Sequence, residues 1–164
     1  MPHPICKPAP LRIEPERPED GATIDALVLA AFGPGRFAKT AERLRESGGP
    51  TAGFVAREDG RIVGSVRLWS IRIDETPALF LGPIAVAGDR RRSGLGAELV
   101  QACIAYAQAK GVSGVLLVGD AWFERFGFLA APDVRLPGPV DRRRLFWLPV
   151  ASEGAPGGAV APAS

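Results

Sequence analysis

Apolar residues recur along this chain at two periods, and the period indicates where helices and strands lie. After the helix-start signal Pro18-Glu19-Asp20, apolar residues occur at i, i+3, i+4 and i+7, one face of an amphipathic helix: Ile24, Leu27, Val28 and Ala31. A second, short helix is expected over residues 38–46. The longest helix is expected over residues 93–110, where Gly111 follows an apolar stripe made of Leu95, Leu99, Ala102, Cys103 and Tyr106.

Shorter apolar runs predict strands, and they cover residues 11–13, 53–57, 61–73, 78–86, 112–118 and 144–150. Asp59-Gly60 lies between the second and third runs and is a strong hairpin signal. Gly82-Pro83 interrupts the run 78–86. Because proline cannot donate to a strand ladder, this pair predicts a bulge or a place where neighbouring strands part. The order of the elements, with one helical turn at 122–126, indicates an α/β or α+β sheet with one parallel crossover around the long helix.

The two ends of the chain lack this periodicity. Residues 1–10 hold four prolines and predict a flexible leader. Residues 151–164 are almost entirely alanine, glycine, proline and serine, which predicts a disordered tail. A single folded domain is therefore expected over residues 11–150, and the length of 164 residues agrees with one domain.

Composition and charge exclude several function classes. Hydrophobic residues make up 46% and charged residues 23%, as in an ordinary globular protein. The formal charge of +2 is too small for a typical nucleic-acid binder, so the arginines at 90–92 and 142–144 are not interpreted as a nucleic-acid surface. The chain has no signal-peptide core and no apolar stretch of about 18 residues, so we expect a cytoplasmic protein without a membrane partner.

The chain also lacks the cysteine and histidine patterns that a metal site or a histidine triad would need. The two cysteines are Cys6 in the leader and Cys103 on the long helix, a placement that suggests neither a disulfide framework nor a zinc site. His3 is the only histidine and lies near the terminus. We therefore expect no metal and no histidine triad.

Chemistry concentrates in residues 81–96, where a buried strand leads through a basic loop into the long helix. A helix N-terminus carries unpaired N–H groups and suits an anion. Gly94 and Gly96 let a diphosphate approach the backbone, Arg91 and Arg92 add charge, and Ser93 can cap the helix. The chain has no P-loop, and this segment lacks the third glycine of the dinucleotide fingerprint. The alternative is a plain helix start with solvated arginines.

Three blocks of this sequence resemble a known family. Arg91-Arg-Ser-Gly-Leu-Gly96 matches the arginine/glutamine-x-x-glycine-x-glycine signature of the GNAT superfamily of N-acetyltransferases. Leu81-Gly-Pro-Ile-Ala-Val86, Gly119-Asp120 and Phe123-Glu-Arg-Phe-Gly-Phe128 resemble the corresponding blocks of its YhbS-like branch. The resemblance covers about residues 11–150. It implies a mixed, mostly antiparallel central sheet, helices on both faces, and parallel strands 78–86 and 112–118 that splay at the bulge.

The resemblance also implies a cosubstrate and a reaction. Acetyl-CoA would donate its acetyl group directly to an amine of an unidentified small molecule or peptide, without a metal. The pantetheine arm would lie along the backbone in the splayed gap, and the pyrophosphate would lie at the glycine loop. The implied cofactor-binding residues are Ile84, Ala85, Val86, Arg91, Arg92, Ser93, Gly94, Leu95, Gly96, Ala97, Trp122 and Phe123.

The proton-transfer residues depart from the family pattern. Trp122 and Phe123 stand where this branch usually has tyrosines, and neither can protonate a thiolate. Tyr106, the only tyrosine, falls on the helix stripe and is interpreted as core. Asp120 is the candidate general base, and its alternative is a cap for the following turn. A second hypothesis is therefore a CoA-binding member with weak or no transferase activity, acting as a sensor or interaction module.

Residues around the acceptor are less constrained by the sequence. Residues 33–39 occupy the place of the family's acceptor loop, with a plain connection as the alternative. Arg67 and Trp69 share one face of a strand and either line the same cleft or, as we favour, pack across strands. The acceptor's identity and the oligomeric state, including a homodimer, stay open.

Overall fold

The turn at Asp59-Gly60, which the sequence predicted as a hairpin, joins the first two long strands of the sheet. The computed structural model describes residues 11–32, 50–90, 94–138, 140–151 and 156–163. Asp59 and Gly60 have φ of 53° and 76°, as a two-residue turn with positive φ at both positions requires. The turn lies between the second and third of four consecutive strands that pair antiparallel: β1 (Arg12–Pro15), β2 (Ala52–Glu58), β3 (Arg61–Ile73) and β4 (Thr76–Val86).

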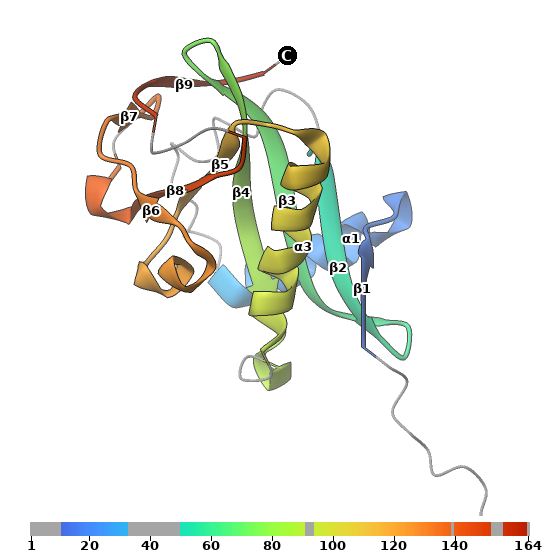
Figure 1. The fold of residues 1–164 in the computed structure, drawn as a ribbon. Coiled ribbons are helices and arrows are strands. Elements are labelled where there is room, and N and C mark those ends of the chain that lie inside the picture. Colours follow the sequence, from blue (N-terminus) through green and yellow to red (C-terminus); the bar gives the residue numbers. More distant parts are fainter. Residues whose placement is uncertain (1–10, 33–49, 91–93, 139, 152–155, 164) are drawn as a thin grey trace, which may run out of the picture.

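The second half of the sheet begins with a parallel crossover. The chain leaves β4 through the 3-10 turn η2 (Gly88–Arg90) and helix α3 (Leu95–Lys110), and returns in β5 (Gly114–Val118), parallel to β4. Strand β8 (Leu145–Pro149) pairs antiparallel with β5, and β6 (Leu129–Ala130) pairs with β8. The predicted mixed, mostly antiparallel sheet with one parallel unit is therefore confirmed (Figure 1).

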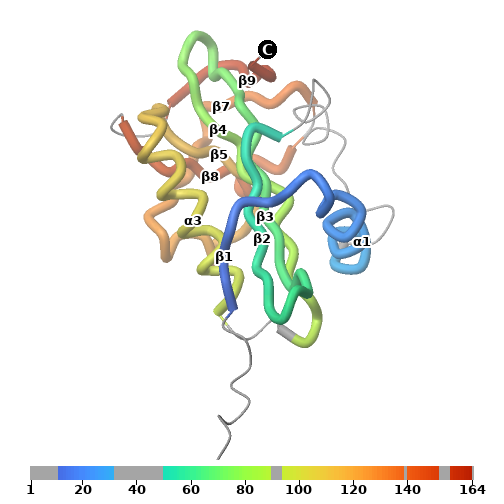
Figure 2. The backbone as a smooth tube through the Cα atoms, turned by 90° about the vertical axis from the view of Figure 1, so that its right-hand side faces the viewer, coloured from blue at the N-terminus to red at the C-terminus, as the bar shows by residue number. Residues whose placement is uncertain are grey.

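Helices cover opposite faces of this sheet, as Figure 2 shows for α1 (Gly21–Phe32) and α3. The 3-10 turn η1 (Pro18–Asp20) precedes α1, as the proline and acidic residues predict. Helix α1 buries Ile24 and Val28 against strand residues Val55, Ile62 and Ala85. Helix α3 buries its stripe in the main core, where the helical members are Leu95, Leu99, Val100, Cys103 and Ala107. The helix expected over residues 38–46 lies outside the described residues.

The C-terminal segment corrects the expectation of a disordered tail. Residues Gly158–Pro162 form strand β9, which pairs antiparallel with the end of β3 and parallel with β7 (Val134–Arg135). Val160 is buried in an apolar cluster. The backbone N–H of Asp74 donates to the carbonyl of Ala159 at 2.8 Å, and the carboxylate of Asp74 accepts from the N–H of Ala159 at 3.0 Å. Composition alone could not reveal this pairing, because its partners lie far away in the sequence.

Two short elements complete the described chain. The 3-10 turns η3 (Ala121–Phe126) and η4 (Arg142–Arg144) lie at the two ends of the segment between β5 and β8. No helix in the described part of the chain is both long and apolar enough to cross a bilayer.

Candidate active site

The parallel strands β4 and β5 separate in the middle of the sheet. They pair only at Leu79 with Val115 and at Phe80 with Leu116, although β4 continues to Val86 and β5 to Val118. The sequence prediction that strands separate near Gly82-Pro83 is confirmed. Beyond these pairs, backbone groups of β4 have no hydrogen-bond partner in β5, and those of β5 have none in β4.

A bulge at Gly82-Pro83 causes this separation. Val66 pairs with Ile84 and Leu68 with Leu81, so β4 takes three residue steps where β3 takes two. The Gly82–Pro83 peptide is cis. Trp69 on β3 donates its indole N–H to the carbonyl of Gly82 at 2.6 Å. This bond satisfies a carbonyl that the ladder with β5 does not reach.

The N-terminus of α3 begins next to this gap, and no described residue covers it in front. Gly94 is the N-cap residue with φ of 79°, a left-handed conformation that suits glycine, and a Cβ built on it would meet no described residue within 4 Å. The first N–H groups of a helix have no intrahelical partner, so those of Leu95, Gly96 and Ala97 are available to an anion. The predicted loop residues Arg91, Arg92 and Ser93 lie outside the described residues.

The two adjacent aromatic residues after β5 have different environments. Trp122 is half-buried beside the first turn of α3, and its ring lies 3.6 Å from the place that a Cβ on Gly96 would take. The guanidinium of Arg125 lies 5.0 Å from the centre of the Trp122 ring. Phe123 instead points into the main core, where it packs against Phe128. Of the two, Trp122 lies at the surface of the predicted cofactor site.

Asp120 lies two residues after the end of β5 and is exposed. Its Oδ1 accepts a hydrogen bond from the backbone N–H of Trp122 at 3.0 Å, which makes it the N-cap of η3. The capping interpretation is therefore confirmed. Its role as a general base stays a prediction.

Tyr106 lies far from the splayed strands. It is eleven residues along α3 from Leu95, which corresponds to about 16 Å of helix. Its ring packs edge to face against Phe54 on β2, with centroids 6.2 Å apart, and the amine of Lys110 lies 5.5 Å from its ring centre. This packing agrees with the interpretation of Tyr106 as a core residue and not as an acid.

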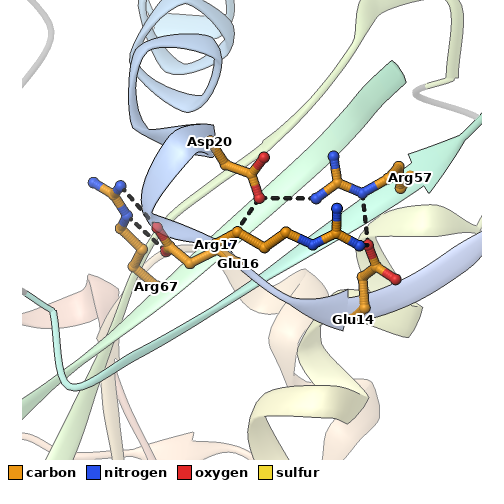
Figure 3. A network of polar contacts seen from close by, with 6 residues as sticks. All are labelled: Glu14, Glu16, Arg17, Asp20, Arg57 and Arg67. Carbon is orange, nitrogen blue, oxygen red and sulfur yellow. Dashed lines mark hydrogen bonds and ion pairs between the residues drawn. The ribbon is translucent and has the colours of Figure 1, made fainter. Parts of the chain in front are cut away.

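Arg67 and Trp69 lie on the same face of β3, opposite to α3. Trp69 packs in an apolar cluster with Ile71 and Phe80, as the cross-strand interpretation predicted. Arg67 instead forms a bidentate ion pair with Glu16, with N–O distances of 3.0 and 3.1 Å (Figure 3). Sequence reasoning missed this pair.

Two further ion pairs, both made by Arg57, form a separate polar network on the same segment. Arg57 on β2 donates to Glu14 at 2.6 Å and to Asp20 at 2.8 Å, and Asp20 also accepts the backbone N–H of Arg17 (Figure 3). The hydrogen bond from Arg57 lowers the pKa of the buried Asp20 carboxyl below its ordinary value. The network fixes the segment between β1 and α1 on the face of the sheet that α1 covers.

Within the described residues, no group of three or more histidine, cysteine or acidic side chains is placed to hold a metal ion. Of the predicted residues in the described part of the chain, the structure gathers eight around the end of β4 and the start of α3: Ile84, Ala85, Val86, Gly94, Leu95, Gly96, Ala97 and Trp122.

Comparisons with known proteins agree with this geometry. The model of the acetyltransferase (GNAT) family matches residues 22–128. YhbS of Escherichia coli K12, described as an uncharacterized N-acetyltransferase, is 34% identical over 120 residues, which are 71% of this chain and 72% of that protein.

Two solved structures share this fold. The crystal structure of YhbS from Escherichia coli in complex with CoA has a TM-score of 0.81 and 29% identity, covering 98% of this chain and 94% of that one. A GNAT family acetyltransferase from Brucella melitensis in complex with acetyl-CoA has a TM-score of 0.74 and 28% identity, covering 94% and 96%. The parallel strands separate, α3 begins at a glycine, and the family model and these relatives match the chain. The chain therefore belongs to the acetyltransferase (GNAT) family.

Proposed function

We propose that this protein binds acetyl-CoA and transfers the acetyl group directly to an amine. The observation that carries the proposal is the position of the gap between β4 and β5, which ends beside the open N-terminus of α3. A long ligand with a phosphate group at one end and an amide-containing arm at the other matches both features. The complexes of YhbS with CoA and of the Brucella protein with acetyl-CoA support this choice of ligand.

Each part of the ligand has its own contacts in this proposal. The backbone of Ile84, Ala85 and Val86 would bond to the amides of the pantetheine arm. The N–H groups of Leu95, Gly96 and Ala97 would bond to the pyrophosphate, together with Arg91, Arg92 and Ser93. Trp122 would flank the ligand where its ring borders Gly96.

The proposed reaction needs little from the protein beyond positioning. The lone pair of a neutral amine attacks the thioester carbon, the C–N bond forms, and the C–S bond breaks with CoA leaving as a thiolate. The amine proton passes to water or to Asp120, and the thiolate takes a proton from solvent. Trp122 and Phe123 cannot supply that proton, and Tyr106 lies too far away.

The alternative is a protein that binds CoA without efficient transfer. It is motivated by the absence of tyrosine at positions 122 and 123. The two proposals agree on binding and differ on turnover, so one assay separates them.

The test begins with calorimetric titration of the purified protein with acetyl-CoA, CoA and ATP. Saturable micromolar binding of acetyl-CoA, with a much weaker ATP response, is expected. The same preparation is then screened with amino acids, polyamines, aminoglycosides and peptides for release of CoA thiol. Release above the rate without protein supports the transferase. Binding without release under any amine supports the sensor, and no binding overturns both.

A further inference from the structure

We infer that Trp69 is a positioning residue for the acetyl-CoA site, because its indole N–H fixes the carbonyl of Gly82 at the bulge. The inference rests on the proposed function. The bond is short, 2.6 Å, and joins β3 to β4 at the point where β4 leaves β5. Only 9% of Trp69 is exposed, so water competes weakly for either partner.

The face on which Trp69 lies gives this bond its effect. Trp69 belongs to the cluster on the side of the sheet opposite to α3, together with Ile71 and Ile73. Its indole therefore holds the Gly82 carbonyl toward that side. A carbonyl held there is turned away from the ladder edge, where it could otherwise accept from β5.

The bulge in turn sets the register of the strand that follows it. Beyond Gly82-Pro83, β4 resumes pairing with β3 at Val66 with Ile84 and at Ser65 with Ala85. A slip of one residue would exchange the two faces of β4 and move every backbone group that we assign to the pantetheine arm. Loss of the indole N–H should therefore affect the arm of the ligand and leave its nucleotide end unaffected.

A second buried tryptophan provides a matched control. Trp147 on β8 belongs to the same apolar cluster and is fully buried. Its indole N–H makes no hydrogen bond among the described residues. Trp147→Phe thus removes the same atoms as Trp69→Phe from the same cluster, but it breaks no bond to the bulge.

The experiment compares Trp69→Phe, Trp147→Phe and the wild type by calorimetry with two probes. One probe is acetyl-CoA and the other is 3′-phosphoadenosine 5′-diphosphate, which has the nucleotide end and lacks the arm. Trp69→Phe should bind acetyl-CoA about tenfold more weakly and the nucleotide within about twofold of the wild type. Trp147→Phe should bind both probes like the wild type.

The outcomes separate this inference from the proposed function. Equal weakening of both probes, unchanged acetyl-CoA binding in Trp69→Phe, or the same loss in Trp147→Phe overturns the role of Trp69 alone. A wild type that binds neither probe overturns the proposed function itself. If Trp69→Phe does not fold, the indole N–H resonance of Trp69 is followed in the wild type. It must shift with acetyl-CoA and not with the nucleotide, and equal shifts or none overturn the inference.

Discussion

Glu16 and Arg67 meet above the bare backbone of Gly53, where Nε and Nη2 of the arginine each donate to one carboxylate oxygen, at 3.0 and 3.1 Å. Gly53 is the strand partner of Arg67, and a Cβ on it would overlap the carboxylate. The side chains of Arg67 and Glu16 are 19% and 17% exposed, so water screens the pair only in part. The pair ties the segment after β1 to the middle of the sheet.

Gly53→Ala should therefore lower the free energy of unfolding by about 2 kcal/mol, because the new methyl group displaces Glu16 and leaves Arg67 without its partner. Urea denaturation measures the change. Gly21→Ala is the control, since a Cβ there meets no described residue within 4 Å. Glu16→Gln should cost a similar amount, and the double variant should cost clearly less than the sum. Additive costs would contradict this mechanism.

Asp20 should make stability depend on pH in the acid range. Its hydrogen bond from Arg57 lowers its folded-state pKa below the ordinary value of 3.8. A depressed pKa contributes stability that is fully present above that ordinary value and is lost as pH falls through the folded-state pKa. The free energy of unfolding of the wild type should therefore fall more steeply below about pH 4 than that of Asp20→Asn. Parallel curves for the two proteins would show that Asp20 makes no such contribution.

Gly94 tests the anion site at the start of α3. Gly94→Asp places a carboxylate in the space in front of the helix that no described residue fills, where we propose the pyrophosphate lies. Gly94→Asn is the neutral match, and asparagine and aspartate both tolerate the left-handed φ of 79° better than other side chains do. Acetyl-CoA should bind to the aspartate variant at least about tenfold more weakly than to the asparagine variant. Calorimetry showing equal affinities for the two would mean that the loop has been misassigned.

Cys103 should be unreactive in the folded protein. It lies fully buried on α3, and burial raises the pKa of its thiol. In a Cys6→Ser variant Cys103 is the only thiol, so a disulfide reagent at pH 8 should titrate almost none before unfolding and one equivalent in denaturant. Rapid titration of the native variant would contradict the burial. The same variant gives a low background for measuring the release of CoA thiol.

Local patterns predicted the parts of this structure that depend on neighbouring residues. The Asp59-Gly60 hairpin, the long helix ended by Gly111 and the bulge at Gly82-Pro83 all follow from the conformations of a few consecutive residues. Strand β9 was missed because its partners on β3 lie far away along the chain.

The candidate site shows the same division. The separation of β4 and β5 was predicted, because it rests on the pair Gly82-Pro83. The glycine loop stays a prediction, because Arg91, Arg92 and Ser93 lie outside the described residues. The pair Glu16–Arg67 joins residues 51 positions apart and needs the missing side chain of Gly53, so no periodic signal marks it. Which of Trp122 and Phe123 would face the site was equally hidden, because the 3-10 turn η3 decides it and its geometry depends on the cap at Asp120.

Asp120 provides the decisive test of proton transfer, because its two roles respond differently to one substitution. Asparagine caps helices about as well as aspartate, so Asp120→Asn should preserve the bond to the N–H of Trp122 and the free energy of unfolding. It cannot accept a proton as a base does. If Asp120 is the base, kcat at neutral pH should fall at least about tenfold while acetyl-CoA affinity stays unchanged.

Asp120→Ala serves as the comparison, since it removes both roles and should also lower stability by about 1 kcal/mol. Thiol release measured from pH 6 to pH 9 completes the test. If both variants lose kcat, and the loss becomes smaller at high pH where the amine is already neutral, the result supports Asp120 as the base. Full activity in Asp120→Asn would mean that this carboxylate only caps the turn and that the amine loses its proton to water.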